Sequence, residues 1–144
     1  TVEGPPLPWQ RAGRRGARTY TPTQLARYET LVAWKALAAR QQLSVPWPLD
    51  AKYAILVDAY CADGRRGDFD NLLKTPGDAC QARRRSKRFP GAPGVLWKND
   101  HQIVDGRVRV YEGCEQPFAR IHVAVVDGPL DAVTFAAPQR KGTP

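Results

Sequence analysis

The stretch that decides the fold is residues 53–78, which read YAILVDAYCADGRRGDFDNLLKTPGD. Its first eight residues are nearly all apolar, which predicts a short and largely buried β-strand at 53–60. A turn rich in glycine, aspartate and arginine follows, and a helical pattern begins at Asp68. Proline inside a helix removes a hydrogen bond and clashes with the preceding turn, so Pro76 and the glycine after it predict a kink or a restart.

Periodic patterns on both sides of this stretch supply the remaining elements. Apolar residues recur at helical spacing from about residue 22 to residue 42, where Thr21 can cap the helix and Pro22 suits its first turn. Residues 104–110 and 118–126 alternate with a period of two around a turn, which predicts an antiparallel hairpin. Trp9, Trp34 and Trp47 are interpreted as packing residues rather than as platforms for stacked bases, whereas Trp97, near Asp100 and next to Lys98, is kept as the exception.

Length and composition favour one domain. The chain has 144 residues, a size that one hydrophobic core can serve. Residues 1–18 form an irregular, proline-rich and basic arm, residues 19–127 hold the periodic patterns, and residues 128–144 are compatible with a disordered tail. No apolar run approaches the roughly 18 residues of a membrane helix, so we expect no membrane partner. Three widely spaced cysteines without a CxxC pair predict reduced thiols and a cytoplasmic location.

Positive charge is concentrated in two parts of the chain. The formal net charge is +8; residues 11–18 contribute four arginines, and residues 61–110 hold eleven basic against six acidic residues. This balance favours a polyanion such as nucleic acid as the partner. The residues expected to contact phosphates are Arg14, Arg15, Arg18, Arg65, Arg66, Arg83, Arg84, Arg85, Lys87, Arg88 and Lys98. A solvated, flexible loop explains the basic run at 83–88 equally well.

Several carboxylates lie between these basic segments. Asp68 and Asp70 are two residues apart at the strand-to-helix junction, and Lys74 follows one helical turn after Asp70. With Asp100 they offer three carboxylates, the oxygen ligands that Mg²⁺ prefers, and an ammonium that can stabilise charge on a phosphate. His101 is at most a phosphate or water contact, because imidazole is a poor ligand for Mg²⁺. The alternative is that the two aspartates near the helix start only cap it.

The same residues carry a resemblance to a known family. From about residue 8 to residue 126 the chain resembles the RusA-type Holliday junction resolvases, endodeoxyribonucleases of phage and prophage origin. The family signature combines a basic turn, D-x-D-N-L-x-K with an aspartate four residues further on, and later an acidic pair before a strand. It matches Arg65, Arg66, Asp68, Asp70, Asn71, Leu72, Lys74 and Asp78, and then Asn99, Asp100, Gln102, Val104 and Asp105.

The resemblance implies a fold, a function and a site. A RusA-like chain has an α+β fold, a single small domain with a mixed β-sheet packed by two main helices, and acts as a homodimer that cuts four-way junction DNA symmetrically. It implies that Asp68, Asp70 and Asp100 bind Mg²⁺, for which Mn²⁺ can substitute, and that Lys74 assists at the scissile phosphate. Asp78 matches a family aspartate whose role is open. No small-molecule cofactor is implied.

Two departures from the family pattern keep other hypotheses open. Asn99 replaces one member of the acidic pair, and residues 75–77 interrupt a helix that the family continues. A junction-binding protein that has lost its nuclease activity is therefore the main alternative. A basic RNA-binding module is a further one, although the aromatic strand signatures of common RNA folds are absent. Flaps and replication forks also remain candidate substrates within the nuclease hypothesis.

Overall fold

The predicted buried strand, β4 (Lys52–Tyr60), is the strand around which the sheet is built. The computed structural model describes residues 1–10, 13–15, 18–20, 22–62, 64, 68–81 and 95–135, with the backbone alone at 13–15, 18–20 and 131. The order in the sheet is β1 (Val2–Glu3), β6 (Phe118–Val126), β4 and β5 (Ile103–Tyr111). Since β4 runs parallel to β5 and antiparallel to β6, the sheet is mixed, as predicted.

The central position of β4 separates two strands that the sequence pattern pairs with each other. The predicted hairpin of residues 104–110 and 118–126 is wrong, because β4 lies between β5 and β6 and pairs with both. The cause is that residues 53–59 are all buried, and a strand that is apolar on both faces is best accommodated in the interior of a sheet. The segment after β5 therefore crosses the end of β4, where the Cys61 backbone donates to Tyr111 at 2.8 Å.

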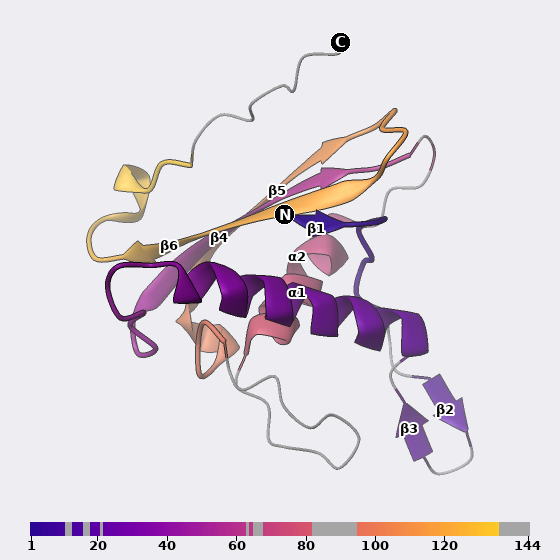
Figure 1. The fold of residues 1–144 in the computed structure, drawn as a ribbon, viewed down its shortest axis with the longest axis horizontal. Coiled ribbons are helices and arrows are strands. Elements are labelled where there is room, and N and C mark those ends of the chain that lie inside the picture. The colour runs from indigo at the N-terminus through magenta and orange to yellow at the C-terminus, as the bar shows by residue number, and fades with distance from the viewer. Residues whose placement is uncertain are drawn as a thin grey trace.

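Both helices lie on one face of the sheet (Figure 1). α1 (Thr23–Gln41) matches the helix predicted at about 22–42 and buries Leu25 and Val32 against the core. α2 (Phe69–Cys80) follows β4 in the chain and packs against α1, β4 and β5. The predicted α+β class with two main helices is therefore confirmed. Among the described residues no helix is long and apolar enough to cross a membrane.

α2 continues through its proline. The helix is unbroken from Phe69 to Cys80 with Pro76 inside it, so the predicted restart is wrong. Proline costs about 3 kcal/mol in a helix interior, and burial of the second half of the helix offsets that cost. Pro76 and Gly77 are buried, and the Gly77 carbonyl accepts a hydrogen bond of 3.1 Å from the Trp97 indole. Tertiary packing therefore stabilises a helix that local propensity disfavours.

The core lies between the helices and β4. Tyr53 and Ile55 of β4 pack with Trp97, which is fully buried. Trp47 stacks on Tyr53 with ring centroids 5.6 Å apart, so it is a packing residue, as predicted. The exception made for Trp97 is wrong, because a fully buried ring cannot stack on a base. Trp34 differs, because 54% of it is exposed on α1.

Parts of the predicted irregular arm form strands. Val2 is buried, and β1 pairs with the start of β6. β2 (Gly13–Arg15) pairs with β3 (Arg18–Tyr20) in a separate two-stranded sheet. The prediction that residues 1–18 are irregular is therefore wrong for these strands. Strands of two or three residues are too short for an alternating pattern to reveal them.

The beginning of the predicted tail packs against the face of the sheet that the helices leave open. Phe135 has its ring 6.5 Å from that of His122 and lies under the guanidinium of Arg107. His122 and Arg107 are the register partners of Leu56 in β4. Successive side chains of a strand point to opposite faces, so Leu56, next to the core residue Ile55, faces away from the helices. Residues 136–144, the rest of the predicted tail, lie outside the described residues.

Candidate active site

The first turn of α2 presents two exposed carboxylates. Asp68 immediately precedes the helix and Asp70 lies in its first turn. The Asp68 carbonyl accepts the Leu72 amide at 3.0 Å as the helix begins. The Asp68 side chain makes no cap hydrogen bond; it accepts one of 3.4 Å from the side-chain amide of Asn71. The capping alternative therefore does not describe the Asp68 carboxylate, which is available to a ligand.

Lys74 lies one turn further along α2, against a tryptophan from the N-terminal segment. The Lys74 Nζ is 3.7 Å from the centroid of the Trp9 ring. The Trp9 backbone amide also donates a hydrogen bond of 2.8 Å to the Asn71 carbonyl. Sequence reasoning misses this contact, because no local pattern connects residue 9 with α2. Lys74 therefore follows Asp70 by one helical turn, and its ammonium has an aromatic neighbour that spacing does not reveal.

A short 3-10 helix, η1 (Asp100–Gln102), carries the third predicted carboxylate. Asn99 caps this helix, because its side-chain oxygen accepts the His101 amide at 3.1 Å. The Gln102 side chain in turn accepts the Asn99 amide at 3.0 Å, which completes a capping box. Asn99, which departs from the family's acidic pair, therefore has a structural role in forming the turn.

Gln102 also fixes this turn to the beginning of β4. Its side-chain amide donates to the carbonyls of Leu49 and Ala51 at 2.9 and 2.7 Å. The Asp100 side chain is 57% exposed on the anchored turn, and Nδ1 of His101 lies 3.6 Å from its carboxylate. Asp100 is therefore accessible and held at a defined place at the start of β5.

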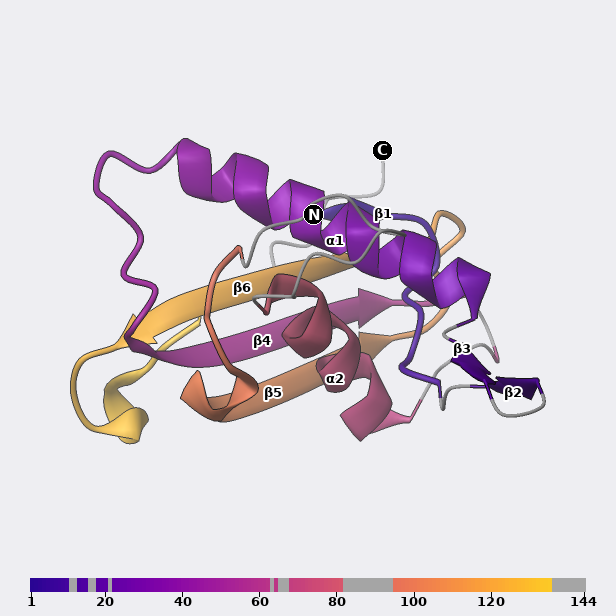
Figure 2. The same ribbon diagram turned by 90° about the horizontal axis from the view of Figure 1, so that it is seen from below.

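The direction of α2 decides where these residues lie relative to one another. The helix runs back along the parallel strands β4 and β5. Leu73, near its beginning, lies against Gly106 within β5, whereas Gly77 lies near Ile103, where β5 starts. The beginning of α2 is therefore at the end of the sheet where β5 ends, and η1 is at the end where β5 begins (Figure 2).

The three predicted metal ligands are consequently not brought together within one chain. Asp68 and Asp70 lie at one end of α2 and Asp100 lies toward the other. The 12 residues of α2 span about 18 Å at about 1.5 Å per residue. Among the described residues no group of three or more histidine, cysteine, aspartate or glutamate side chains could hold a metal ion. A single protomer therefore does not supply the predicted three-carboxylate site.

The other predicted residues fall into two groups. Lys98 forms an ion pair of 2.6 Å with Asp50, and Asp78 is half-buried in the second half of α2. The side chains outside the described part of the protein are those of Arg14, Arg15, Arg18, Arg65, Arg66, Arg83, Arg84, Arg85, Lys87 and Arg88. For these arginines and this lysine, DNA contact stays a prediction.

A buried ion pair on the open face of the sheet is a feature that sequence reasoning misses. Asp58 of β4 is 1% exposed, and Arg109 of β5 holds its two oxygens at 2.5 and 2.9 Å. Hydrogen bonding to that carboxylate raises the pKa of Arg109. His122 Nε2 lies 3.4 Å from the same carboxylate. Because Asp58 is inaccessible, we interpret the cluster as structural.

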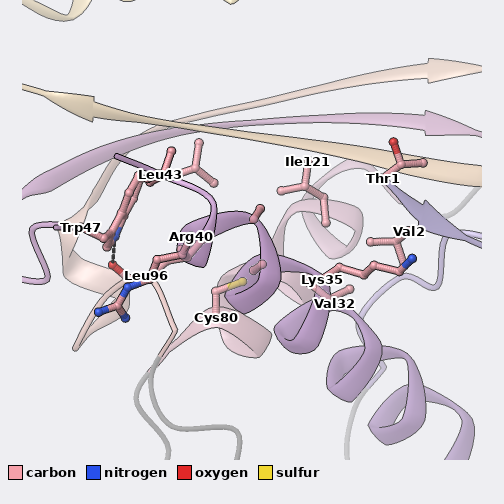
Figure 3. Close-up of a pocket in the computed structure, with 13 residues that line it drawn as sticks. Thr1, Val2, Val32, Lys35, Arg40, Leu43, Trp47, Cys80, Leu96 and Ile121 are labelled. Carbon is pink, nitrogen blue, oxygen red and sulfur yellow. Dashed lines mark hydrogen bonds between the residues drawn. The ribbon is translucent and has the colours of Figure 1, made fainter. Parts of the chain in front are cut away.

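A cavity of about 270 Å³ lies between α1 and the edge of the sheet (Figure 3). Its walls are mainly apolar and include Val32, Leu43 and Ile121, with Lys35 and Arg40 also lining it. None of the predicted site residues lines this cavity. The predicted acidic residues therefore lie on the exposed surface, toward the two ends of α2, and outside the cavity.

Comparison with known proteins assigns the chain to a family. No curated protein matches it. A family model described as endodeoxyribonuclease RusA matches residues 3–125, which is most of the 144 residues and includes β4, α2, η1, β5 and nearly all of β6. The match therefore covers both parts of the acidic site as well as the sheet that separates them. The chain belongs to the RusA family of endodeoxyribonucleases.

Proposed function

We propose that this protein is a metal-dependent endodeoxyribonuclease that resolves four-way DNA junctions by paired, symmetric cuts. The single observation that carries the proposal is the pair of exposed carboxylates, Asp68 and Asp70, at the start of α2, with Lys74 one helical turn after Asp70. They lie inside the region that matches the RusA family model. The family acts on junction DNA, and two carboxylates followed by a lysine are part of the side-chain set that metal-dependent phosphodiester hydrolysis uses.

Each active site is shared between two copies of the chain in this proposal. Asp68 and Asp70 are at one end of α2, and Asp100 is exposed toward the other end. A second copy related by a two-fold axis can bring its own η1 to the beginning of α2. Asp68 and Asp70 of one protomer then combine with Asp100 of the partner subunit. The same operation builds a second, identical site, which suits two symmetric cuts.

The donor set suits a hard divalent cation only in this shared form. Carboxylate oxygens, water and phosphate oxygens are the ligands of Mg²⁺ in proteins, and Mn²⁺ accepts the same set. When bound, the ion would polarise the phosphoryl group and make water a better nucleophile. Asp68 and Asp70 contribute exposed carboxylates on a helix whose position is fixed by packing. Lys74 contributes a positive charge that stabilises the charge developing on the phosphate.

Both departures from the family pattern are compatible with activity. Asn99 uses its side chain to cap η1, and this presents Asp100 to solvent. Pro76 lies in an unbroken helix beyond Asp70 and Lys74, so these two residues keep their relation along the helix face. The hypothesis of a decayed nuclease was motivated by Asn99 and by the expected break at Pro76, and neither now argues against activity.

Cleavage of a synthetic four-way junction tests the proposed function. The wild-type protein should introduce paired nicks with Mg²⁺ or Mn²⁺ and none in excess EDTA. Asp70→Asn should lower the cleavage rate by roughly 100-fold while junction binding is retained. Asp127→Asn is the matched control, because it makes the same change at an exposed aspartate just after β6, and should cut like wild type. Equal rates for wild type and Asp70→Asn would contradict the proposal.

A further inference from the structure

The N-terminal segment is attached to the first turns of α2 through Trp9. Its amide donates to the Asn71 carbonyl at 2.8 Å, and its ring centroid is 3.7 Å from the Lys74 Nζ. Three prolines in residues 5–8 restrict the backbone that leads to it. Trp9 is half-buried while Lys74 is exposed. A stiff segment therefore presents an aromatic face at a defined place, and the lysine ammonium lies over it.

An aromatic ring holds an ammonium in a way that a carboxylate does not. The ring attracts the cation through its quadrupole, yet it does not neutralise the charge. The N–H groups that point away from the ring remain free to donate to another acceptor. Among the described residues no ion pair involves Lys74. The full positive charge is therefore kept for a phosphate that arrives at the first turn of α2.

Positioning matters for a lysine in particular. Its ammonium is carried on a flexible stem of four carbons, which is mobile when unrestrained, and ordering this stem costs free energy. A group that is already in place when the substrate binds does not incur that cost in the transition state. We propose that Trp9 is the positioning residue for Lys74, fixing the ammonium beside Asp70 where the developing phosphate charge is stabilised. This inference rests on the proposed nuclease function.

The ring contact is tested without DNA. The lysines of the intact protein are reductively methylated with ¹³C, which keeps their charge, and Lys74 is assigned by the signal that Lys74→Arg removes. We expect the Lys74 methyl signal to be displaced upfield by the Trp9 ring, and Trp9→Leu to return it to the position of exposed lysines. Trp34→Leu, the same change at an exposed tryptophan of α1, should not move it. A Lys74 signal that Trp9→Leu leaves unmoved would overturn the contact.

The catalytic consequence is tested by single-turnover cleavage of the four-way junction at saturating enzyme. Trp9→Leu should slow cleavage by about tenfold and change the junction Kd by less than about twofold, since the backbone hydrogen bond of residue 9 is kept. Trp9→Phe, which retains an aromatic face, should recover most of the rate. Trp34→Leu should match wild type in both measurements.

Three outcomes would go against this inference or the function beneath it. Unchanged or faster cleavage by Trp9→Leu would show that the ring does not assist Lys74. A rate that falls only in proportion to weaker junction binding would show that Trp9 acts in binding and not in positioning. A wild-type protein that does not cut junctions would overturn the proposed function itself, and the methyl signal would still report whether the ring contact exists.

Discussion

Asp58 is a carboxylate in the middle of the most apolar strand of the chain. Burying a charge is unfavourable unless it is paired and hydrogen-bonded. Arg109 meets this requirement with two bonds from the neighbouring strand, and its guanidinium reaches from the open face of the sheet. The pair links β4 with β5, the two strands along which α2 packs. The pairing of Asp58 therefore affects β4 and β5, the two strands that support α2 with Asp68 and Asp70.

Removing the arginine of this pair should cost much more stability than removing a neighbouring one. Arg109→Leu leaves Asp58 buried without its partner, and we expect the free energy of unfolding to fall by about 3 kcal/mol. Arg107→Leu breaks an ion pair with Asp105 whose arginine side chain is 47% exposed, and should cost less than about 1 kcal/mol. Urea denaturation of both variants at neutral pH measures the difference. Similar losses in the two variants would contradict this account of Asp58.

Local residue patterns reveal only some of the site. Asp70 and Lys74 can be related from sequence because residues four apart share a helix face, and Asp68 immediately precedes the same helix. The role of Asn99 as a cap and the contact of Trp9 with Lys74 depend on how distant segments meet. No spacing rule connects them, so the structure is needed to find both.

At the scale of elements, the close approach of α2 to β5 depends on one glycine. A Cβ added to Gly106 would overlap the Leu73 Cδ2 atom. The absence of a side chain at this position leaves room for the Leu73 side chain, through which α2 packs on β5.

Gly106→Ala should therefore destabilise the protein, by about 1–3 kcal/mol, because overpacking forces the helix or the leucine to move. In a Leu73→Ala background the same substitution should cost clearly less, since the overlapping methyl group is gone. Thermal denaturation of the four proteins forms a double-mutant cycle that measures the coupling. Additive effects of the two substitutions would show that the contact does not limit the approach of α2.

The elements themselves could be predicted from sequence better than their pairing. The limits of α1, β5 and β6 follow from periodicity and those of β4 from a continuous apolar run, and both are local properties. The partner of each strand is not local: β5 and β6 are consecutive in the chain, yet β4 lies between them because its residues 53–59 are buried. The continuation of α2 through Pro76 has the same origin, since packing against Trp97 outweighs local propensity.

At the scale of the whole molecule, the topology itself argues for a shared active site. β4, α2 and β5 form a parallel strand-helix-strand unit, and in such a unit the helix begins at one end of the sheet while the next strand begins at the other. Asp68 and Asp70 lie where the helix begins, and Asp100 lies where the next strand begins. A sequence shows three aspartates in order and cannot show this separation until the crossover is known. Two copies are the simplest way to unite the carboxylates.

Subunit mixing tests this claim most directly. Asp70→Asn and Asp100→Asn chains with different tags are co-expressed, and the mixed dimer is purified through both tags. The substrate is a supercoiled plasmid that extrudes a cruciform, on which one active site yields a nicked circle and two yield a linear product. If the sites are shared, the Asp70→Asn chain and the Asp100→Asn chain place both substitutions in one site. The other site of the mixed dimer then carries neither substitution.

With a shared site, each variant alone should be inactive, whereas the mixed dimer should keep one of its two active sites and convert the plasmid to nicked circle without linear product. If each site were built within one chain, every site of the mixed dimer would carry one substitution. A mixed dimer as inactive as the two single variants would therefore contradict a site shared between two chains.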